Sequence, residues 1–317
     1  MKRRMTKHFI TGGAGFIGSH LSDKLLADGN QVTVYDNLVT GNENNIKHLI
    51  GKNGFQIING DLLNDKALNI AMKEYDVVWH LAGNTDIQKG NRITDLDLKN
   101  CTIATRNVLE AMRENKIEKV LFSSSACVYG DPPHVPLSET FGPLLPINLY
   151  GAGKLACEGL FSAYSHLFGI KVCMFRYANV VGGRMGHGVI FDFIQKLKKN
   201  PNELEILGDG KQEKPFFLVE DCIDGMICAF KNSEAQCDVF NLGTETHTTV
   251  IRIGEIVTEE MGLKNIKFKY TGGNRGWAGD APVIHFNVGK MKKLGWQASH
   301  SSDEAVRLAA RRLIVNA

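Results

Sequence analysis

The feature that most restricts the fold of this 317-residue chain is a glycine-rich segment at residues 12–18. It follows a short apolar run at residues 8–11, which has the composition of a buried strand, and it precedes a segment with helical spacing of apolar residues. Glycines at positions 12, 15 and 18 permit a tight turn, close approach of the backbone to a phosphate, and close packing of helix on strand. This order predicts the first β-α unit of a dinucleotide-binding fold.

Short runs rich in Val, Ile and Phe alternate with longer helical patterns through the first half of the chain. This alternation is typical of parallel strands covered by helices. The fold class is therefore predicted to be α/β, with a Rossmann-type doubly wound parallel sheet. A proline-rich stretch at residues 130–148 is predicted to be an irregular loop, because proline lacks the amide donor. We predict strands at residues 8–11, 31–36, 55–60, 76–81, 119–123 and 171–177, and helices at residues 16–28, 93–114 and 149–168.

An acidic residue stands where a dinucleotide-binding unit requires one. Asp36 ends the second predicted strand, where a carboxylate binds both ribose hydroxyls and repels a 2′-phosphate. The glycine segment and Asp36 together predict NAD, rather than NADP, as the cofactor. Asp61 and Leu62 after the third strand, and Leu81, Ala82 and Gly83 after the fourth, are further candidates that have packing as their alternative role.

Beyond residue 180 the alternation of strands and helices becomes less regular. The pattern there predicts a helix at residues 188–199, short strands at 205–207, 216–219 and 238–242, and two late helices. We predict a Rossmann domain for NAD from residues 1–182 and about 216–247. Residues of about 183–215 and 248–317 are predicted to form a smaller, partly interleaved α/β lobe for the substrate.

A second group of residues has the chemistry of a general base. Tyr150 and Lys154 are four residues apart in a predicted helix, so they share a face. Ser125 follows the fifth predicted strand, where its hydroxyl can hydrogen-bond a substrate oxygen that becomes a carbonyl. A free phenol titrates near ~10, and the cations of a lysine and a nicotinamide are expected to lower that pKa. The pattern predicts oxidation at a carbon that carries a hydroxyl group.

Composition and charge exclude several other classes of function. The 37 basic and 34 acidic residues give a net charge of +3 without a basic patch, so we expect no nucleic-acid partner. No apolar run approaches the length of a membrane span, so we expect no membrane partner. The seven cysteines are scattered without a CxxC pair, which predicts no disulfide framework, no metal site and a cytoplasmic location.

The motifs together resemble the extended short-chain dehydrogenase/reductase family, whose members act on nucleotide sugars. Within that family the chain is most similar to the short bacterial and archaeal UDP-glucose 4-epimerases. The resemblance runs nearly from end to end. It is carried by residues 12–18, 36–41, 80–83, 123–130, 150–154, 176–179, 208–212 and 275–280.

The resemblance implies three sets of site residues. The catalytic set is Ser125, Tyr150 and Lys154. The residues implied for NAD binding are Gly12, Gly15, Phe16, Ile17, Gly18, Asp36, Asn37, Thr40, Gly41, Asp61, Leu62, Leu81, Ala82, Gly83, Asn100, Ser123, Tyr150, Lys154, Tyr177 and Ala178. Those implied for the substrate are Thr85, Ser125, Asn179, His187, Gly188, Val189, Lys214, Arg275 and Asp280.

The chain departs from the family pattern at positions that bear on the reaction. The sugar 4,6-dehydratases and glucuronate decarboxylases of the family carry acidic residues just before the Val-Tyr-Gly segment, and here Ala126 and Cys127 occupy those positions. The missing carboxylate disfavours elimination and decarboxylation. Lys214 stands where the family has a diphosphate-binding arginine, and it lacks the bidentate fork. Arg275 is displaced relative to the usual pattern, with Trp277 in its place.

Cys127 has two interpretations. The segment around it is similar to that of GDP-mannose 3,5-epimerase and GDP-fucose synthase, in which a cysteine moves protons at the sugar ring, and His187 lies where that group supplies a partner acid. A thiolate near a cation deprotonates a carbon next to a C4 ketone in such a reaction. In the other interpretation Cys127 is a small packed side chain.

The resemblance implies NAD-dependent epimerisation of a UDP-hexose at C4 through a 4-keto intermediate. The first alternative is a 3,5-epimerase or C4-dehydrogenase that uses Cys127 on a GDP-sugar or another nucleotide sugar. The second is a catalytically silent NAD-sensing regulator, against which the intact catalytic set argues.

The resemblance also implies a homodimer, formed through the predicted helices at residues 93–114 and 149–168. Val108, Leu109, Leu160 and Phe161 are compatible with that contact. They are equally compatible with packing against the sheet.

Overall fold

The computed structural model describes residues 5–316 and divides into two compact units. Unit 1 contains the residues up to 128 together with 149–176 and 229–240, and unit 2 contains 129–148, 177–228 and 241 onward. Unit 2 thus takes in the proline-rich stretch and residues 216–228, which the predicted boundaries assign to the NAD-binding lobe. The assignment of cofactor and substrate to separate lobes stays a prediction.

Unit 1 is built on a seven-stranded sheet with the strand order β12-β7-β5-β4-β1-β2-β3. Strands β1 and β2, β1 and β4, β2 and β3, and β4 and β5 pair in parallel. The order reverses at β1, and such a switch point is where open α/β sheets bind ligands. The predicted fold class is confirmed. The strands are β1 (Lys7–Thr11), β2 (Gln31–Asp36), β3 (Phe55–Asn59), β4 (Val77–His80), β5 (Lys119–Ser125), β7 (Lys171–Tyr177) and β12 (Cys237–Leu242).

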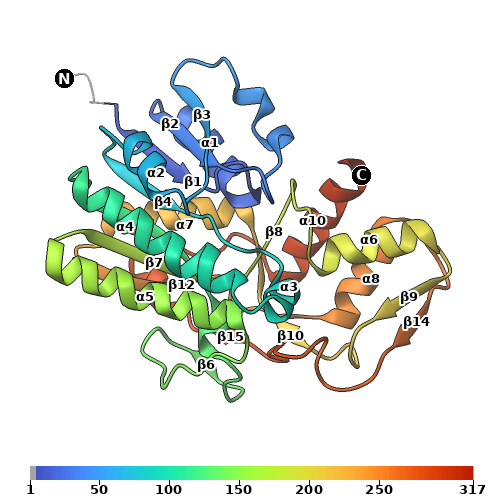
Figure 1. Cartoon of the computed structure of the whole chain (residues 1–317). Coiled ribbons are helices and arrows are strands. Elements are labelled where there is room, and N and C mark those ends of the chain that lie inside the picture. The colour runs from blue at the N-terminus through green and yellow to red at the C-terminus, as the bar shows by residue number, and fades with distance from the viewer. Residues whose placement is uncertain (1–4, 317) are drawn as a thin grey trace. The chain divides into compact units, whose positions relative to one another are not determined.

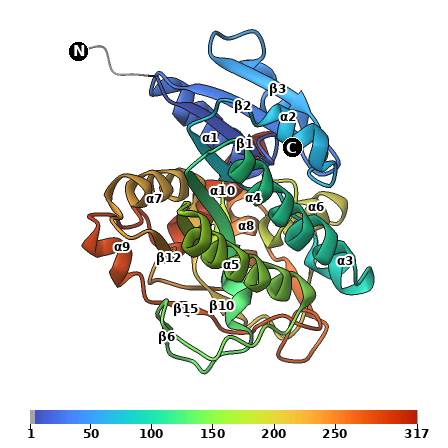
Figure 2. The ribbon, with the colours of Figure 1, turned by 60° about the vertical axis from the view of Figure 1, so that its left-hand side comes forward.

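Helices cover the sheet, and its strands are apolar on both faces. Helices α2 (Asp65–Ala71), α4 (Ala104–Glu114) and α5 (Leu149–Phe168) pack on one face, and Figures 1 and 2 show α4 and α5 side by side. Helix α1 (Phe16–Ala27) contacts β1 and β2. Because side chains alternate along a strand, each strand also contributes apolar residues to the opposite face. One example is Trp79, whose ring lies 5.8 Å from that of Phe230 in α7 (Val219–Asn232). The core beneath α2, α4 and α5 includes Phe9, Leu68, Val78, Val108, Leu109, Val120, Phe122 and Phe161.

The predicted helix at residues 93–114 is in fact interrupted. Helix α3 (Ile87–Arg92) ends first, and a π-helical turn, η3 (Leu98–Ile103), leads into α4. The amide of Ala104 donates to the carbonyl of Lys99, the wide spacing of a π-turn. Such turns often mark functional sites, and this one packs on α5. Periodicity alone missed it because a π-turn adds one residue without interrupting the apolar pattern.

Unit 2 combines three packed helices with small two-stranded sheets. Helices α6 (Val189–Lys199), α8 (Val250–Glu260) and α10 (Ser302–Asn316) share one apolar cluster. The proline-rich stretch is not wholly irregular, because its β6 (Pro136–Leu137) pairs in parallel with β15 (His285–Phe286). Within residues 5–316, no helix has the length and apolar composition that crossing a membrane requires. The remaining elements of unit 2 are β8 (Asn179–Val181), β9 (Glu203–Ile206), β10 (Glu213–Lys214), β11 (Phe216–Leu218), β13 (Thr248–Thr249), β14 (Lys267–Tyr270) and α9 (Gly289–Lys293).

The packing of α5 on the sheet gives a test of the core. Phe161 is fully buried, and its ring lies 4.6 Å from that of Phe122 and 6.2 Å from that of His80. We expect Phe161→Ala to lower the free energy of unfolding by about 3–5 kcal/mol, because it leaves a cavity that the sheet cannot fill. Chemical denaturation followed by circular dichroism measures the change.

The matched control is Phe168→Ala at the half-exposed end of the same helix. Phe168 has an exposed cation–π contact with Arg113, which is worth about 1 kcal/mol or less. Equal losses in the two variants would contradict the assigned core.

Candidate active site

The glycine segment forms the tight turn between β1 and α1. Gly12 has a φ of +70°, and a Cβ there would lie 2.7 Å from both the nitrogen and the Cα of Ala82. A Cβ at Gly18 would lie 2.4 Å from the carbonyl oxygen of Gly12. Gly15 is the N-cap of α1, and no side chain among the described residues caps this helix. The amides of its first turn are therefore available to an anion such as a pyrophosphate.

Asp36 lies at the end of β2, directly beside this turn. Its Oδ2 accepts a hydrogen bond from the amide of Ala14 at 3.0 Å, and its Oδ1 accepts one from the amide of Leu38 at 2.9 Å. Burial raises the pKa of Asp36, and these two hydrogen bonds oppose that effect. A Cβ at Gly41 would lie 2.6 Å from Oδ1, so only glycine permits this approach. The turn and the carboxylate fit the pyrophosphate and the ribose of NAD.

The other cofactor residues predicted in unit 1 lie at or near the same edge of the sheet. Asn37 donates from Nδ2 to Oδ2 of Asp61 at 3.4 Å, and this contact joins the ends of β2 and β3. Leu62 is only 8% exposed and belongs to the hydrophobic core, so packing accounts for its position. Thr40 is exposed. The half-buried members of the predicted set are Gly12, Gly15, Phe16, Ile17, Gly41, Leu81, Ala82, Gly83, Asn100 and Tyr150.

Ser125, Tyr150 and Lys154 come together in unit 1, at the end of β5 and the start of α5. A hydrogen bond joins the side chains of Ser125 and Tyr150. Nζ of Lys154 lies 5.7 Å from the centre of the Tyr150 ring. Lys154 is only 3% exposed, and its ammonium donates to the carbonyl of Ser123. The helical spacing of Tyr150 and Lys154 accounts for their shared face.

Opposing effects act on the charges of this group. Burial raises the pKa of Tyr150 to about 12, while the cation of Lys154 and the hydrogen bond with Ser125 lower it. The predicted lowering by lysine is therefore present, but burial outweighs it and the phenol is protonated at neutral pH. Burial also acts to lower the pKa of Lys154, yet the charges of Tyr150 and Cys101 help to raise it overall. Lys154 is thus a buried cation.

A buried ion pair that the sequence did not reveal holds this group in place. Nε and a terminal nitrogen of Arg176 donate to the two carboxylate oxygens of Glu158 at 3.0 and 2.7 Å. The hydroxyl of Ser124 donates to the same carboxylate at 2.5 Å. These contacts tie β5, α5 and β7 together one turn away from Lys154. Arg176 belongs to the family motif at residues 176–179. Nothing in the sequence marked Glu158 as its partner, beyond its place in the predicted helix at residues 149–168.

Asp97 is a second residue that the sequence did not predict. It is 1% exposed, and Oδ1 accepts a hydrogen bond from Nδ2 of Asn84 at 3.0 Å. Its Oδ2 is buried and has no hydrogen-bond partner among residues 5–316. Burial raises the pKa of Asp97, while Asn84 and the charge of Lys154 lower it. Asp97 lies outside every motif and reaches this position just before the π-helical turn.

Cys127 lies in the short turn that follows β5. Its amide donates to Oγ of Ser125 at 3.1 Å, and a Cβ at Gly151 would lie 2.5 Å from its carbonyl oxygen. A negative charge on Cys127 raises the pKa of Tyr150, so the two side chains are close enough to interact. The thiol therefore belongs to the surroundings of the phenol, with Ala126 beside it.

Three of the predicted substrate residues meet in unit 2. The ammonium of Lys214 donates to Oδ1 of Asp280, which is 7% exposed. One terminal nitrogen of Arg275 donates to the backbone carbonyl of Asp280 at 2.6 Å, and the other donates to Oδ2 of Asp131 at 2.5 Å. Asp131 was not predicted, because it lies in the proline-rich stretch and pairs with Arg275 only in the folded chain.

The other candidate residues have simpler environments. The hydroxyl of Tyr177 donates to Sδ of Met226 at 2.7 Å, and the amide of Ala178 donates to the carbonyl of Leu242 at 2.9 Å. Asn179 donates from Nδ2 to the carbonyl of Pro215 at 3.2 Å. Thr85, His187 and Gly188 are exposed, and Val189 is half-buried at the start of α6.

Comparison with known proteins identifies the family of this chain. Residues 8–243 match the model of the NAD dependent epimerase/dehydratase family. A Methanocaldococcus jannaschii protein that carries the provisional name UDP-glucose 4-epimerase is 34% identical over 309 residues, which are 94% of this chain and 95% of that protein. UDP-glucuronic acid decarboxylase 1 of Xenopus tropicalis is 34% identical over 80% of this chain and 60% of that protein.

A crystal structure of UDP-galactose 4-epimerase superimposes with a TM-score of 0.88 at 36% identity, and the match covers 98% of this chain and 99% of that one. These relatives include both epimerases and decarboxylases, so they establish the family and leave the reaction open. The predicted resemblance to extended short-chain dehydrogenases/reductases is confirmed. The chain is an enzyme of the NAD-dependent epimerase/dehydratase family, and its cofactor is NAD.

Proposed function

We propose that this enzyme epimerises a UDP-hexose at C4 of the sugar. The observation that carries the proposal is the phenol of Tyr150, which is hydrogen-bonded to Ser125 and lies beside the buried cation of Lys154. No carboxylate accompanies it at Ala126 or Cys127, where the dehydratases and decarboxylases of the family have acidic residues.

Each residue of the group has a defined task in this reaction. Tyr150 reacts in its ionised form, which the cation of Lys154 favours. As a phenolate it accepts the proton of the C4 hydroxyl and later returns it, as a positioned general base and acid. Ser125 orients the same oxygen as it becomes a carbonyl. Lys154 stabilises the phenolate electrostatically and, through its bond to the carbonyl of Ser123, stays fixed between β5 and α5. Bound NAD would supply the acceptor and then the donor for the hydride of C4.

Inversion at C4 requires oxidation followed by reduction, because the hydrogen on that carbon is not acidic. The 4-keto sugar must rotate between the two half-reactions so that its opposite face receives the hydride. The sugar ring therefore needs loose contacts, while the nucleotide is held firmly. We assign nucleotide contacts to Asn179, Lys214, Arg275 and Asp280 of unit 2. In this proposal Asp280 orients Lys214, which contacts the diphosphate as a point charge.

The position of Cys127 supports a second candidate function. Its side chain is near enough to influence Tyr150, so a thiolate there is placed to act on the same substrate. That enzyme would be a 3,5-epimerase or C4-dehydrogenase of a GDP-sugar or another nucleotide sugar, with His187 as the partner acid.

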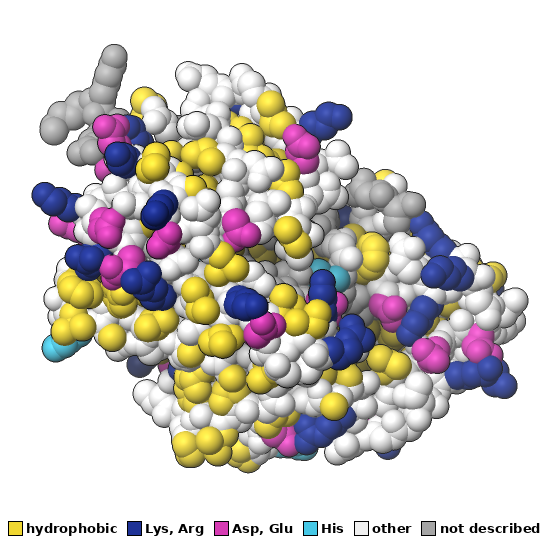
Figure 3. All heavy atoms as spheres, viewed as in Figure 1, with side chains coloured by type: hydrophobic (Ala, Val, Ile, Leu, Met, Phe, Trp, Pro, Cys, Tyr) yellow, Lys and Arg dark blue, Asp and Glu magenta, His cyan; other side chains and the backbone are white. Residues whose placement is uncertain are grey.

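We also propose that the enzyme is a homodimer through the outer surface of α4, η3 and α5. Val108, Leu109 and Phe161 are buried in the core of unit 1, so they serve packing against the sheet. Exposed apolar side chains on these elements are instead Leu98, Ile103, Leu149, Leu167 and Phe168. Figure 3 shows hydrophobic side chains gathered at the surface over α5.

The first test removes the phenolic hydroxyl. Tyr150→Phe is expected to lower kcat on UDP-galactose by about 10²–10⁴-fold, because the general base is lost. NAD that co-purifies with the variant, measured after denaturation, should match that of the wild type. Tyr164→Phe, on the same helix with its hydroxyl on Glu110, is the matched control and should keep full activity. Equal activity of the two variants would overturn the assignment of Tyr150.

The second test concerns the pH dependence of the reaction. The charge of Lys154 lowers the pKa of Tyr150, so Lys154→Met should raise that pKa further. The acid limb of the profile of kcat/KM against pH should therefore move to higher pH, with a loss of about tenfold or more at pH 7. The exposed Lys99 provides the control variant Lys99→Met. A profile that keeps its acid limb in Lys154→Met would exclude the electrostatic role.

The third test separates the two candidate functions. During turnover in D₂O, 4-epimerisation should leave every ring carbon of the product unlabelled, because the C4 hydrogen does not exchange with water. The Cys127 route places deuterium at C3 or C5. Mass spectrometry and NMR of the product distinguish the two, and Cys127→Ala should retain 4-epimerase activity. Deuterium at C3 or C5 that disappears in Cys127→Ala would favour the second candidate.

A further inference from the structure

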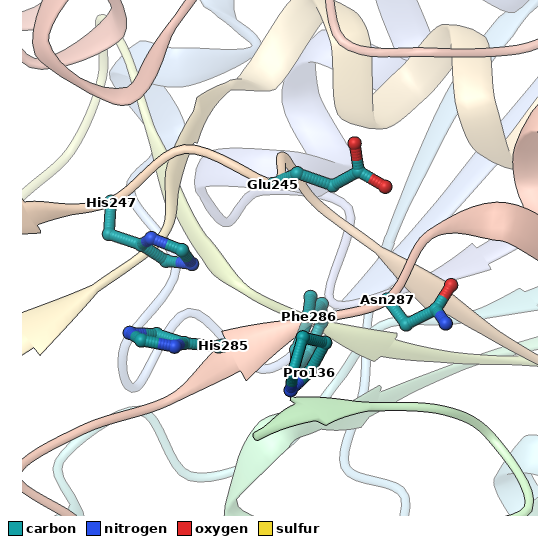
Figure 4. A pocket seen from close by; sticks show the side chains of 6 residues that line it. All are labelled: Pro136, Glu245, His247, His285, Phe286 and Asn287. Carbon is teal, nitrogen blue, oxygen red and sulfur yellow. The ribbon is translucent and has the colours of Figure 1, made fainter. Parts of the chain in front are cut away.

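A cluster of two histidines and a carboxylate lies in unit 2 and takes no part in the proposed reaction. It consists of Glu213 on β10, His247 just before β13, and His285 on β15. One nitrogen or oxygen atom from each residue lies within 4.8 Å of the others. Figure 4 shows the imidazoles of His247 and His285 facing one another. Their ring centroids are 3.8 Å apart, and the interplanar angle is 30°.

The distances in this cluster suit a transition-metal ion. Oε1 of Glu213 lies 3.6 Å from Nδ1 of His247 and 3.4 Å from Nε2 of His285. Zinc binds histidine nitrogen and carboxylate oxygen at about 2.0–2.2 Å, and ligands of a tetrahedral ion are then about 3.3–3.6 Å apart. Both measured separations fall within that range. Because the lone pairs of an imidazole lie in the plane of its ring, the stacked rings would have to separate and turn toward the ion on binding.

The histidines also have unused coordinating capacity. Nε2 of His285, the ring nitrogen that lies toward Glu213, is buried and makes no hydrogen bond within the described part of the chain. Nε2 of His247 is also buried without a partner, but Nδ1 is the nitrogen of that ring that lies toward Glu213. A buried polar atom without a partner is costly, and a cation bound between Glu213 and His285 removes that cost at Nε2 of His285.

The backbone holds the three residues in place. Glu213 pairs with Thr249 across β10 and β13. Its amide donates to Pro282 at 2.8 Å, and its carbonyl accepts from Ile284 at 3.1 Å. The segments before His285 and after His247 therefore both flank Glu213. Such preorganisation by hydrogen-bonded strands favours a metal site over a chance meeting of mobile side chains.

The cluster is separate from the diphosphate contact that we assign to Lys214, the residue next to Glu213. Successive side chains of a strand point to opposite faces, so Glu213 faces away from Lys214 and its partner Asp280. A pocket of about 290 Å³ adjoins the two histidines. Glu245 also lines it, but the carboxylate of that residue accepts a hydrogen bond from Nζ of Lys292 at 2.5 Å. Because Glu245 is engaged by Lys292, it does not supply a fourth ligand. The fourth coordination position of an ion held by the cluster would then open toward the pocket.

We propose that Glu213, His247 and His285 form a zinc-binding site with three protein ligands and one open position. Two imidazoles and one carboxylate form a ligand set that zinc uses in proteins. The sequence predicts no metal site, because the cysteines are scattered without a CxxC pair. The ligands come from three segments that meet only when β10, β13 and β15 assemble.

The test measures metal binding to the full chain after chelator treatment and desalting. Wild-type protein should bind one Zn²⁺ per chain in competition with a chromophoric chelator. His247→Gln, His285→Gln and Glu213→Gln should each weaken binding by at least about tenfold, since loss of an outer-shell partner alone costs about 10–100-fold. His134→Gln, at an exposed histidine of the same unit, is the matched control and should bind as the wild type does.

Cobalt provides a second readout that distinguishes this cluster from the seven cysteines. Wild-type protein loaded with Co²⁺ should develop visible d–d bands without the near-ultraviolet charge-transfer band of a thiolate ligand. The bands should be lost in His285→Gln, while circular dichroism shows that this variant is folded. Wild-type binding no tighter than that of the variants, or a thiolate spectrum that persists in them, would overturn the site.

Discussion

Around the glycine turn of unit 1, backbone segments approach one another so closely that no side chain fits between them. At Gly12 the end of β1 meets the residues after β4, and at Gly18 the first turn of α1 meets the glycine turn itself. Because these contacts join backbone to backbone, the start of α1 is aligned with the switch point of the sheet. The hydrogen bond from Ala14 to Asp36 then carries this alignment to β2. The rest of the cofactor-binding edge depends on that geometry.

The catalytic group depends on a balance between burial and charge. A buried phenol resists ionisation, and the pKa of Tyr150 is accordingly raised to about 12. Lys154 is buried beside it and stays a cation, because the groups around it favour the charged form. A positive charge in a site of low polarity acts more strongly than one in water. The protein thus stores, near the phenol, the electrostatic stabilisation that proton removal requires.

The ion pair of Glu158 and Arg176 has a positioning role in this architecture. Buried ion pairs add little net stability, because desolvation offsets their attraction. They are directional, however, and this one binds Ser124 through a third hydrogen bond. Ser125 and Lys154 are therefore attached to a rigid frame of two strands and one helix.

The sequence alone was sufficient for the parallel sheet, the glycine turn, Asp36 and the pairing of Tyr150 with Lys154. All of these depend on local patterns, namely strand and helix periodicity, glycine spacing and four-residue helical spacing. The division of the chain was less predictable. The pairing of β6 with β15 joins Leu137 to Phe286, and no local pattern marks a pairing so distant in sequence.

Only the tertiary structure placed Glu158 against Arg176, Asp131 against Arg275, and Glu213 beside His247 and His285. It also decided the sign of the shift at Tyr150, because burial depends on every element packed around the phenol. Local patterns record which residues are neighbours along the chain. Contacts between distant segments, and the loss of water that accompanies them, exist only after the chain has folded.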